Sequence, residues 1–190
     1  MHTKHSLYLL FLVIIAALVG GAVSAQENAP RVIPGDIVIN SSFEPDASFW
    51  TVLYKTEDKV KCGGLGHAAT NCAFVFKGGI GEMAKLQQVY TAGINASGTQ
   101  YIGFISHVRP FAPGMQLKFF VKVKFNNGAP MMTKKFLYTS SAALASYESV
   151  EFDTDLFNPA TVSKVVFGVT NKSGGGKAYV DEFFVGAYDN

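Results

Sequence analysis

The chain has 190 residues, with 16 lysines and arginines against 14 aspartates and glutamates, so its formal net charge is +2 at pH 7. A charge so close to zero excludes recruitment of nucleic acid by bulk electrostatic attraction. Two of the four histidines, His2 and His5, lie at the extreme N-terminus. The remaining two, His67 and His107, are few for an enzyme that uses histidine chemistry.

Residues 1–25 have the pattern of a secretory signal peptide. Lys4 precedes an uninterrupted apolar run at residues 7–19, and small residues follow at the cleavage-determining positions within 23–25. The apolar run is shorter than the roughly 20 residues that a membrane-spanning helix needs. We therefore expect the protein to be secreted or displayed at the cell surface, with membrane contact only if this segment, expected to be helical, stays uncleaved.

Residues 26–35 are polar and contain prolines, which indicates a short tether, and residues 36–190 suffice for one domain with a hydrophobic core. Cys62 and Cys72 flank the loop CGGLGHAATNC in this domain. In an oxidising compartment they predict a disulfide that stabilises the fold by about 3 kcal/mol. The alternative is a metal clip that adds His67, although two thiolates and one imidazole fall short of a closed zinc site.

Beyond the tether the hydrophobic pattern has a period of two, which is typical of β-strands. In LKFFVKVKF, residues 117–125, the odd-numbered apolar residues share one face, whereas Phe120 and three lysines share the other. This is the pattern of a half-buried antiparallel strand. About ten such strands predict an all-β sandwich or barrel. Similar runs occupy residues 37–40, 50–55, 72–76, 85–89, 101–108, 132–138, 147–152, 164–169 and 179–185.

The last predicted strand, AYVDEFFVG, contains two consecutive acidic residues. Strict alternation places Asp181 on the same side as Phe183 and Val185, the expected core face, and Glu182 on the opposite side. A carboxylate that points into a core is costly unless it is paired, hydrogen-bonded or bound to a metal ion. Asp181 therefore needs a partner.

Both ends of the domain resemble a known family. IVINSSFE followed by Trp50, and KAYVDEFFVG at the end, resemble the N-x-x-F-E and V-D-[DE] motifs of jelly-roll carbohydrate-binding modules of the galactose-binding-like superfamily, of the CenC type. KLQQVY resembles the family's glutamine-containing strand, and YIGFISHVRP resembles the tyrosine-initiated strand that follows it. The resemblance covers nearly all of residues 36–186 and implies an antiparallel β-sandwich with jelly-roll topology.

The resemblance also implies a structural calcium ion that joins the first and last strands. Matched residue by residue, its side-chain ligands are Glu44 and Asp181, with backbone carbonyls near Ser42 and around residues 70–71. Calcium is a hard cation that prefers carboxylate and carbonyl oxygens. The alternative is that Glu44 is solvated and Asp181 accepts amide hydrogen bonds without a metal. A glycosidase pair is disfavoured, because two carboxylates at a strand junction offer no substrate cleft.

Exposed aromatic residues are the expected sites of glycan contact, because a sugar packs on a flat ring that is flanked by hydrogen-bonding groups. Phe120 is out of place among the lysines of its face. Tyr101 and His107 share one face of their strand, and Arg109 lies just beyond. For each residue the alternative is that it covers the second sheet or is an isolated surface side chain. The candidates are Tyr101, His107, Arg109, Phe120 and Tyr138, with Tyr54 as a further one.

Recognisable catalytic motifs are absent from the sequence, which has neither a G-x-S-x-G elbow nor an H-E-x-x-H pair. We therefore expect an exported, non-catalytic binding module for glycans or polysaccharides rather than an enzyme. The rival hypothesis is a structural or adhesive protein of the cell envelope or matrix, in which the same sandwich contacts proteins. Neither hypothesis involves nucleic acid.

Overall fold

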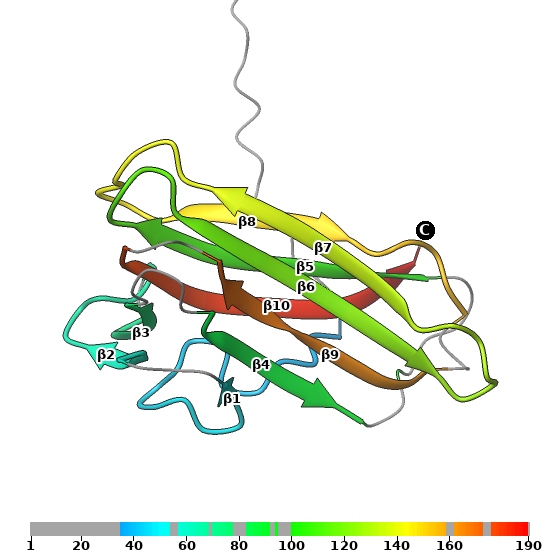
Figure 1. Ribbon diagram of the computed structural model, residues 1–190. Helices are drawn as coiled ribbons and strands as arrows, with labels where there is room; N and C mark the ends of the chain where they lie inside the picture. Colours follow the sequence, from blue (N-terminus) through cyan, green and yellow to red (C-terminus); the bar gives the residue numbers. More distant parts are fainter. Residues whose placement is uncertain are drawn as a thin grey trace, which may run out of the picture. The chain divides into compact units, whose positions relative to one another are not determined.

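The computed structural model describes ten β-strands, arranged as a sandwich of two antiparallel sheets (Figure 1). The strands are β1 (Thr51–Leu53), β2 (Lys59–Cys62), β3 (Cys72–Phe76), β4 (Lys85–Tyr90), β5 (Gln100–Pro110), β6 (Gln116–Phe125), β7 (Met132–Thr139), β8 (Glu148–Asp153), β9 (Val162–Asn171) and β10 (Ala178–Asp189). One sheet has the order β1-β4-β9-β6-β7 and the other β2-β3-β10-β5-β8. Most neighbouring strands are not consecutive in sequence, as jelly-roll winding requires. The prediction of an all-β antiparallel sandwich is confirmed.

The structure describes residues 35–53, 57–68, 70–77, 83–91, 94, 100–158, 162–172 and 176–189. All of them belong to one unit, Ile33–Asn190. The expected signal peptide, the expected tether up to residue 34 and the candidate Tyr54 lie outside the described residues. Within these ranges no helix has the length and apolar character that crossing a membrane requires.

The two sheets enclose one hydrophobic core that is rich in phenylalanine. Alternate residues of each strand point into it, as the period of two requires. In β6, Leu117, Phe119, Val121 and Val123 are core residues, as predicted. Each fully buried phenylalanine contributes about 2 kcal/mol through burial of its apolar surface. The largest buried side chains include Phe43, Phe74, Phe76, Phe104, Phe119, Phe167 and Phe183.

The segment before β1 joins this core from one edge. Phe43 is fully buried and packs on Trp50, with ring centroids 5.3 Å apart, and on Phe183 at 5.9 Å. The Trp50 indole N–H donates to the carbonyl of Asn40 at 2.9 Å, which satisfies the one polar atom of a buried ring. Trp50 is therefore a core residue that fixes the path of the opening motif.

Two details of the N-terminal half differ from the predicted strands. Residues 37–40 form no strand, although Asp36 makes an isolated bridge with Gly186 of the last strand. In contrast, β2 was not predicted, although it pairs with β3 along its whole length. Its four residues, KVKC, alternate too briefly to stand out from a loop.

Strand β10 contains a β-bulge that changes which face its residues occupy. Its register against β5 shifts between Asp181 and Phe184, and Glu182 has a left-handed backbone with a φ of 47°. Val180 before the bulge and Phe183 after it both face the core, so Asp181 and Glu182 both lie on the outer face. The prediction that Asp181 shares the core face of Phe183 is therefore wrong, because simple alternation does not anticipate a bulge.

Candidate functional site

The opening motif and β10 lie side by side, which places both expected calcium ligands beside the same loop. The Ile37 N–H donates to the carbonyl of Val185 at 2.8 Å, and the Phe183 N–H donates to the carbonyl of Ser41 at 3.2 Å. The loop is residues 63–71, between β2 and β3, and we call it the disulfide loop. The two ends of the domain therefore meet, as the calcium hypothesis requires.

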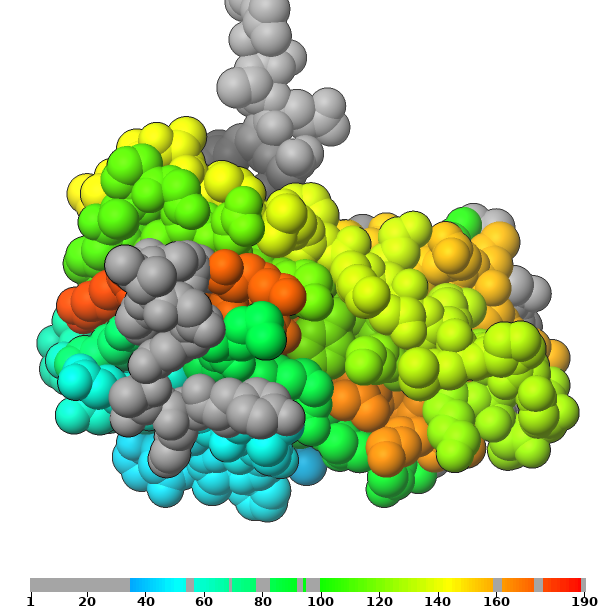
Figure 2. Space-filling view, in the orientation of Figure 1, coloured from blue at the N-terminus to red at the C-terminus, as the bar shows by residue number. Residues whose placement is uncertain are grey.

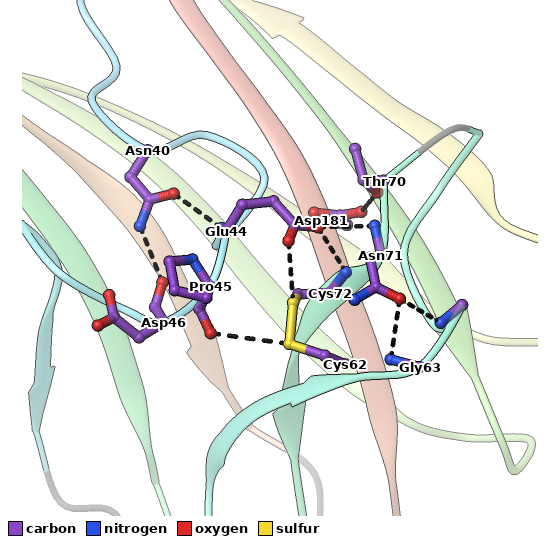
Figure 3. The surroundings of a disulfide bond; sticks show 11 residues. Asn40, Glu44, Pro45, Asp46, Cys62, Gly63, Thr70, Asn71, Cys72 and Asp181 are labelled. Carbon is purple, nitrogen blue, oxygen red and sulfur yellow. Dashed lines mark hydrogen bonds between the residues drawn. A yellow bond between two sulfur atoms is a disulfide. The ribbon is translucent and has the colours of Figure 1, made fainter.

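A disulfide between Cys62 and Cys72 closes the disulfide loop, which confirms the predicted pairing (Figure 3). The Glu44 carboxylate oxygen Oε1 accepts the backbone N–H groups of Asn71 at 2.6 Å and Cys72 at 2.7 Å. Glu44 is itself positioned by Asn40, whose Oδ1 accepts the Glu44 N–H at 2.9 Å. Glu44 is thus an anchor of the disulfide loop, although the residue itself is exposed to solvent.

Asp181 holds the same loop from the other side. Its side chain is fully buried, and its Oδ2 accepts hydrogen bonds from the His67 N–H and the Thr70 hydroxyl, both at 2.7 Å. Burial raises the pKa of Asp181 to about 6, although the hydrogen bonds from Thr70 and His67 oppose that rise. A buried carboxylate of this kind is costly to ionise in the absence of a positive partner.

Each of the two carboxylates has one oxygen that receives no N–H or O–H donor from the described residues. Asp181 Oδ1 is buried without a partner among them. Glu44 Oε2 lies 3.1 Å from the Cys72 sulfur, which has no hydrogen to donate because it belongs to the disulfide. The buried Asp181 oxygen costs free energy unless it finds a partner, whereas Glu44 is exposed and its Oε2 is open to solvent. Two such carboxylate oxygens beside a backbone loop are a donor set that fits calcium.

Two imidazoles and a carboxylate meet on the outer face of β10 and β5. His67 Nδ1 lies 2.6 Å from Glu182 Oε2, and His107 Nδ1 lies 3.5 Å from the same oxygen. The two rings stack with their centroids 3.7 Å apart and an interplanar angle of 11°. Burial, followed by the neighbouring His67, lowers the pKa of His107, which favours the neutral form of its ring. The sequence singles out His107 but gives no indication of its contact with His67.

The rest of this outer face carries aromatic rings. The Arg109 guanidinium lies over the rings of Tyr147 and Tyr179, at 5.2 and 4.7 Å from their centroids. Tyr101 packs against a second tyrosine ring 5.4 Å away. Tyr101, His107 and Arg109 therefore share one face of β5, as predicted, but each is half-buried against its neighbours.

Phe120 lies on the opposite side of the sandwich, on the outer face of the β1-β4-β9-β6-β7 sheet. Only 3% of its surface is exposed, because the ammonium groups of Lys85 and Lys122 lie over its ring at 5.0 and 5.7 Å. Lysine side chains commonly cover apolar surface in this way while their charges stay in water. The expectation of an exposed Phe120 ring is therefore wrong, and the ring instead lines a concavity.

This concavity has a volume of about 400 Å³ and opens on the sheet face turned towards the viewer in Figure 2. Strands β4, β6, β7 and β9 contribute its side chains, together with Met131, which directly precedes β7. Among the described residues, no carboxylate forms an ion pair with any of its four lysines. We call it the lysine concavity, and it is lined by Lys85, Lys118, Phe120, Lys122, Met131, Thr133, Lys135 and Thr170.

Tyr138 lies on neither outer face of the sandwich. Its register partner in β6 is the core residue Leu117, and its hydroxyl donates to Glu148 of the other sheet. Burial, followed by the Glu148 carboxylate, raises the pKa of Tyr138. The ring is half-buried and links the edges of the two sheets, so the expectation of an exposed Tyr138 is also wrong.

Solved carbohydrate-binding modules share this fold. TmCBM61, solved in complex with β-1,4-galactotriose, matches 79% of this chain and 97% of its own, with a TM-score of 0.55 and 17% identity. A family 16 carbohydrate-binding module matches 79% of this chain and 99% of its own, with the same TM-score and identity. The xylan-binding CBM22-1 domain of Paenibacillus barcinonensis Xyn10C matches 84% and 99%, with a TM-score of 0.53 and 16% identity. No protein-family model and no curated protein matches the chain. The chain thus has the jelly-roll fold of these modules, and identity this low defines the fold alone.

Proposed function

We propose that this protein is a secreted or cell-surface, non-catalytic module that binds glycans through the lysine concavity. The observation that carries the proposal is the concavity itself, a recess of about 400 Å³ on the outer face of a jelly-roll sheet. The fold supports it, because it is the fold of modules described as xylan-binding or solved with β-1,4-galactotriose. The predicted signal peptide at residues 1–25 supports a location outside the cytoplasm.

The lining of the lysine concavity favours an anionic glycan. Its four lysines form no ion pair with a described carboxylate, so carboxylate or sulfate groups of a ligand would gain charge-assisted hydrogen bonds there. Thr133 and Thr170 supply hydroxyl groups, and the exposed Met131 supplies apolar surface for the C–H groups of a sugar ring. The net charge of the whole chain is only +2, so this positive charge is a local feature.

The rival hypothesis of an adhesive envelope protein used exposed aromatic side chains as interface anchors. Phe120 is covered by lysines, and Tyr138 is engaged between the two sheets. Neither side chain is free to serve as such an anchor, and the glycan-binding function is the one we retain.

A retention assay tests the proposal. The mature protein should bind saturably to immobilised polysaccharides that contain uronic acid or sulfate groups, and binding should weaken as salt rises. The double variant Lys118→Ala/Lys122→Ala should lose most of this binding. The matched control is Lys59→Ala/Lys61→Ala, which removes the same charge from β2 in the other sheet and should bind like wild type.

The outcomes separate the two parts of the proposal. Equal loss in both double variants would show that only net charge matters and would overturn the assigned site. Retention on neutral polysaccharides alone would keep the binding function and overturn the anionic ligand class. Failure to bind any glycan would overturn the function.

We also propose that a structural calcium ion is held by Glu44 and Asp181. Both residues accept N–H groups from the disulfide loop, and each keeps one oxygen without a donor from the described residues. When bound, calcium would neutralise both charges and tie the opening motif to β10. Thermal unfolding with and without EDTA tests this, and added calcium, but not magnesium, should restore the melting temperature lost in EDTA.

A further inference from the structure

His67, His107 and Glu182 come together from three separate elements. His67 belongs to the disulfide loop, His107 to β5 and Glu182 to the bulge of β10. One donor atom from each residue lies within 4.8 Å of the other two. The side chains are 30%, 17% and 18% exposed, so the cluster is shielded but reachable from solvent.

The backbone of β10 is distorted where it presents this carboxylate. Glu182 has a φ of 47°, a left-handed conformation that costs a residue with a side chain of order 1 kcal/mol. The bulge places two consecutive carboxylates, those of Asp181 and Glu182, on one face of the strand. Two adjacent carboxylates on a mostly buried surface cost free energy, because both lose hydration, and packing does not offset that cost. One positive partner for each carboxylate would offset it.

The donor set of this cluster differs from that of the calcium site. Imidazole nitrogens suit zinc and its neighbours among the transition metals, whereas calcium prefers oxygen ligands alone. Zinc sites with two histidines and one glutamate keep a fourth position for water or a bound group. Two ligands about 2.0 to 2.1 Å from a tetrahedral zinc ion lie about 3.3 Å apart. The observed separations from Glu182 Oε2, 2.6 Å to His67 and 3.5 Å to His107, bracket that value.

We propose that His67, His107 and Glu182 form a binding site for a divalent transition-metal ion of the zinc type. The two rings are stacked, so a shared ion requires them to splay until their lone pairs converge. His67 provides this freedom, because it lies on a loop and is the most exposed of the three side chains. His107 is held within β5, where Asp181 is its register partner.

The site is separate from both proposals made above. It lies on the opposite sheet from the lysine concavity, so glycan binding does not depend on it. It shares the disulfide loop with the calcium ligands but uses none of their oxygens, because Asp181 contacts the backbone N–H of His67 and Glu182 contacts its ring. A metal ion at this site would fix the His67 side chain, and Asp181 already binds the backbone N–H of the same residue.

The test uses the mature protein, stripped of metals with EDTA and then dialysed into buffer with excess calcium. Calorimetric titration with zinc should show one saturable site that excess calcium does not displace, and cobalt should produce the visible absorption bands of a bound ion. His67→Ala and His107→Ala should each weaken zinc binding by more than roughly 10- to 100-fold, the loss typical of second-shell changes.

His67→Ala is the sharper of the two variants, because alanine keeps the backbone N–H that donates to Asp181 and the loop should stay folded. Lys122→Ala, on the opposite sheet, is the control that should bind zinc like wild type. Circular dichroism checks that each variant is folded. The proposal is overturned if the calcium-loaded protein takes up neither zinc nor cobalt saturably, or if folded His67→Ala and His107→Ala both bind like wild type.

Discussion

Asp181 and Glu182 are neighbours in β10, yet their carboxylates lie on the same outer face of the sheet and serve different partners. The β-bulge at this point makes the arrangement possible. Asp181 accepts hydrogen bonds from the His67 backbone and the Thr70 hydroxyl, whereas Glu182 contacts the His67 ring. The bulge thus lets two adjacent carboxylates hold the disulfide loop. Asp181 binds the His67 backbone, and Glu182 contacts the His67 ring.

Replacing Asp181 by asparagine should remove the calcium dependence of stability. The amide keeps an acceptor oxygen for the loop but lacks the negative charge that calcium needs. In the wild type, calcium at 100 times its dissociation constant should add about 2.7 kcal/mol to the free energy of unfolding. Asp181→Asn should therefore melt at the same temperature with and without EDTA, and below the calcium-loaded wild type.

The matched control for this experiment is Asp155→Asn. Asp155 is exposed and its carboxylate pairs with Lys134 at 3.2 Å, so its loss should leave the EDTA effect intact. If EDTA lowers the melting temperature of Asp181→Asn as much as that of the wild type, the ion is bound elsewhere.

The sandwich could be predicted from the sequence because its longer strands alternate strongly. Strand β6 shows this best, since its lysines occupy one face and its apolar residues, except Phe120, occupy the other. The disulfide could be predicted from the spacing of Cys62 and Cys72 in an exported domain. The short strand β2 could not, because four residues do not establish a period.

The environment of the candidate site could be predicted only in part. Alternation assigns faces correctly along a regular strand, but the bulge at Glu182 reverses the assignment for Asp181 and leaves no signature in the sequence. Phe120 stands on the outer face as predicted, yet the lysines that cover it come partly from β4, distant in sequence. His67 and Glu182 are 115 positions apart, so no local spacing connects them.

Gly168→Ala should destabilise the sheet that carries the lysine concavity. Gly168 has a φ of 154°, and a Cβ built on it would lie 2.1 Å from the carbonyl oxygen of Leu86 in β4. The clash is with backbone, so it cannot be relieved by a rotamer change. We expect the free energy of unfolding, measured by urea denaturation, to fall by more than about 2 kcal/mol.

Gly128→Ala is the control that separates the cost of an unfavourable backbone conformation from the cost of the steric clash at Gly168. Gly128 also has a left-handed φ, of 80°, but a Cβ there would meet nothing within 4 Å. Its cost should be limited to the conformational penalty of about 1 to 2 kcal/mol. Equal losses in the two variants would show that the close approach between β9 and β4 does not matter.

Phe120→Ala and Lys118→Ala should separate stability from binding. Truncating a buried phenylalanine costs about 3 to 5 kcal/mol, so Phe120→Ala should unfold at a much lower urea concentration. Lys118 has lysines around it, and its removal relieves like-charge repulsion, so stability should stay within about 1 kcal/mol of wild type or rise. Only Lys118→Ala therefore reports on glycan binding alone. A large loss of stability in Lys118→Ala would contradict this division of roles.

Raising the pH should weaken binding to an anionic glycan before ordinary lysines lose their charge. Burial, followed by the charges of neighbouring lysines, lowers the pKa of both Lys85 and Lys118. A lysine becomes neutral as the pH rises through its pKa, so a lowered pKa moves the loss of charge to lower pH. Retention on the anionic polysaccharide should be constant near pH 7 and decline before the pH reaches the usual lysine pKa of about 10.4.

Lys85→Arg provides the discriminating variant, because a guanidinium stays charged throughout this pH range. The variant should retain the glycan to higher pH than the wild type does, while both bind alike near pH 7. Circular dichroism at each pH confirms that the fold is intact, so that a decline in retention reports on charge. If the two proteins lose binding at the same pH, deprotonation of Lys85 does not limit the interaction, and the anion must be held by other groups of the concavity.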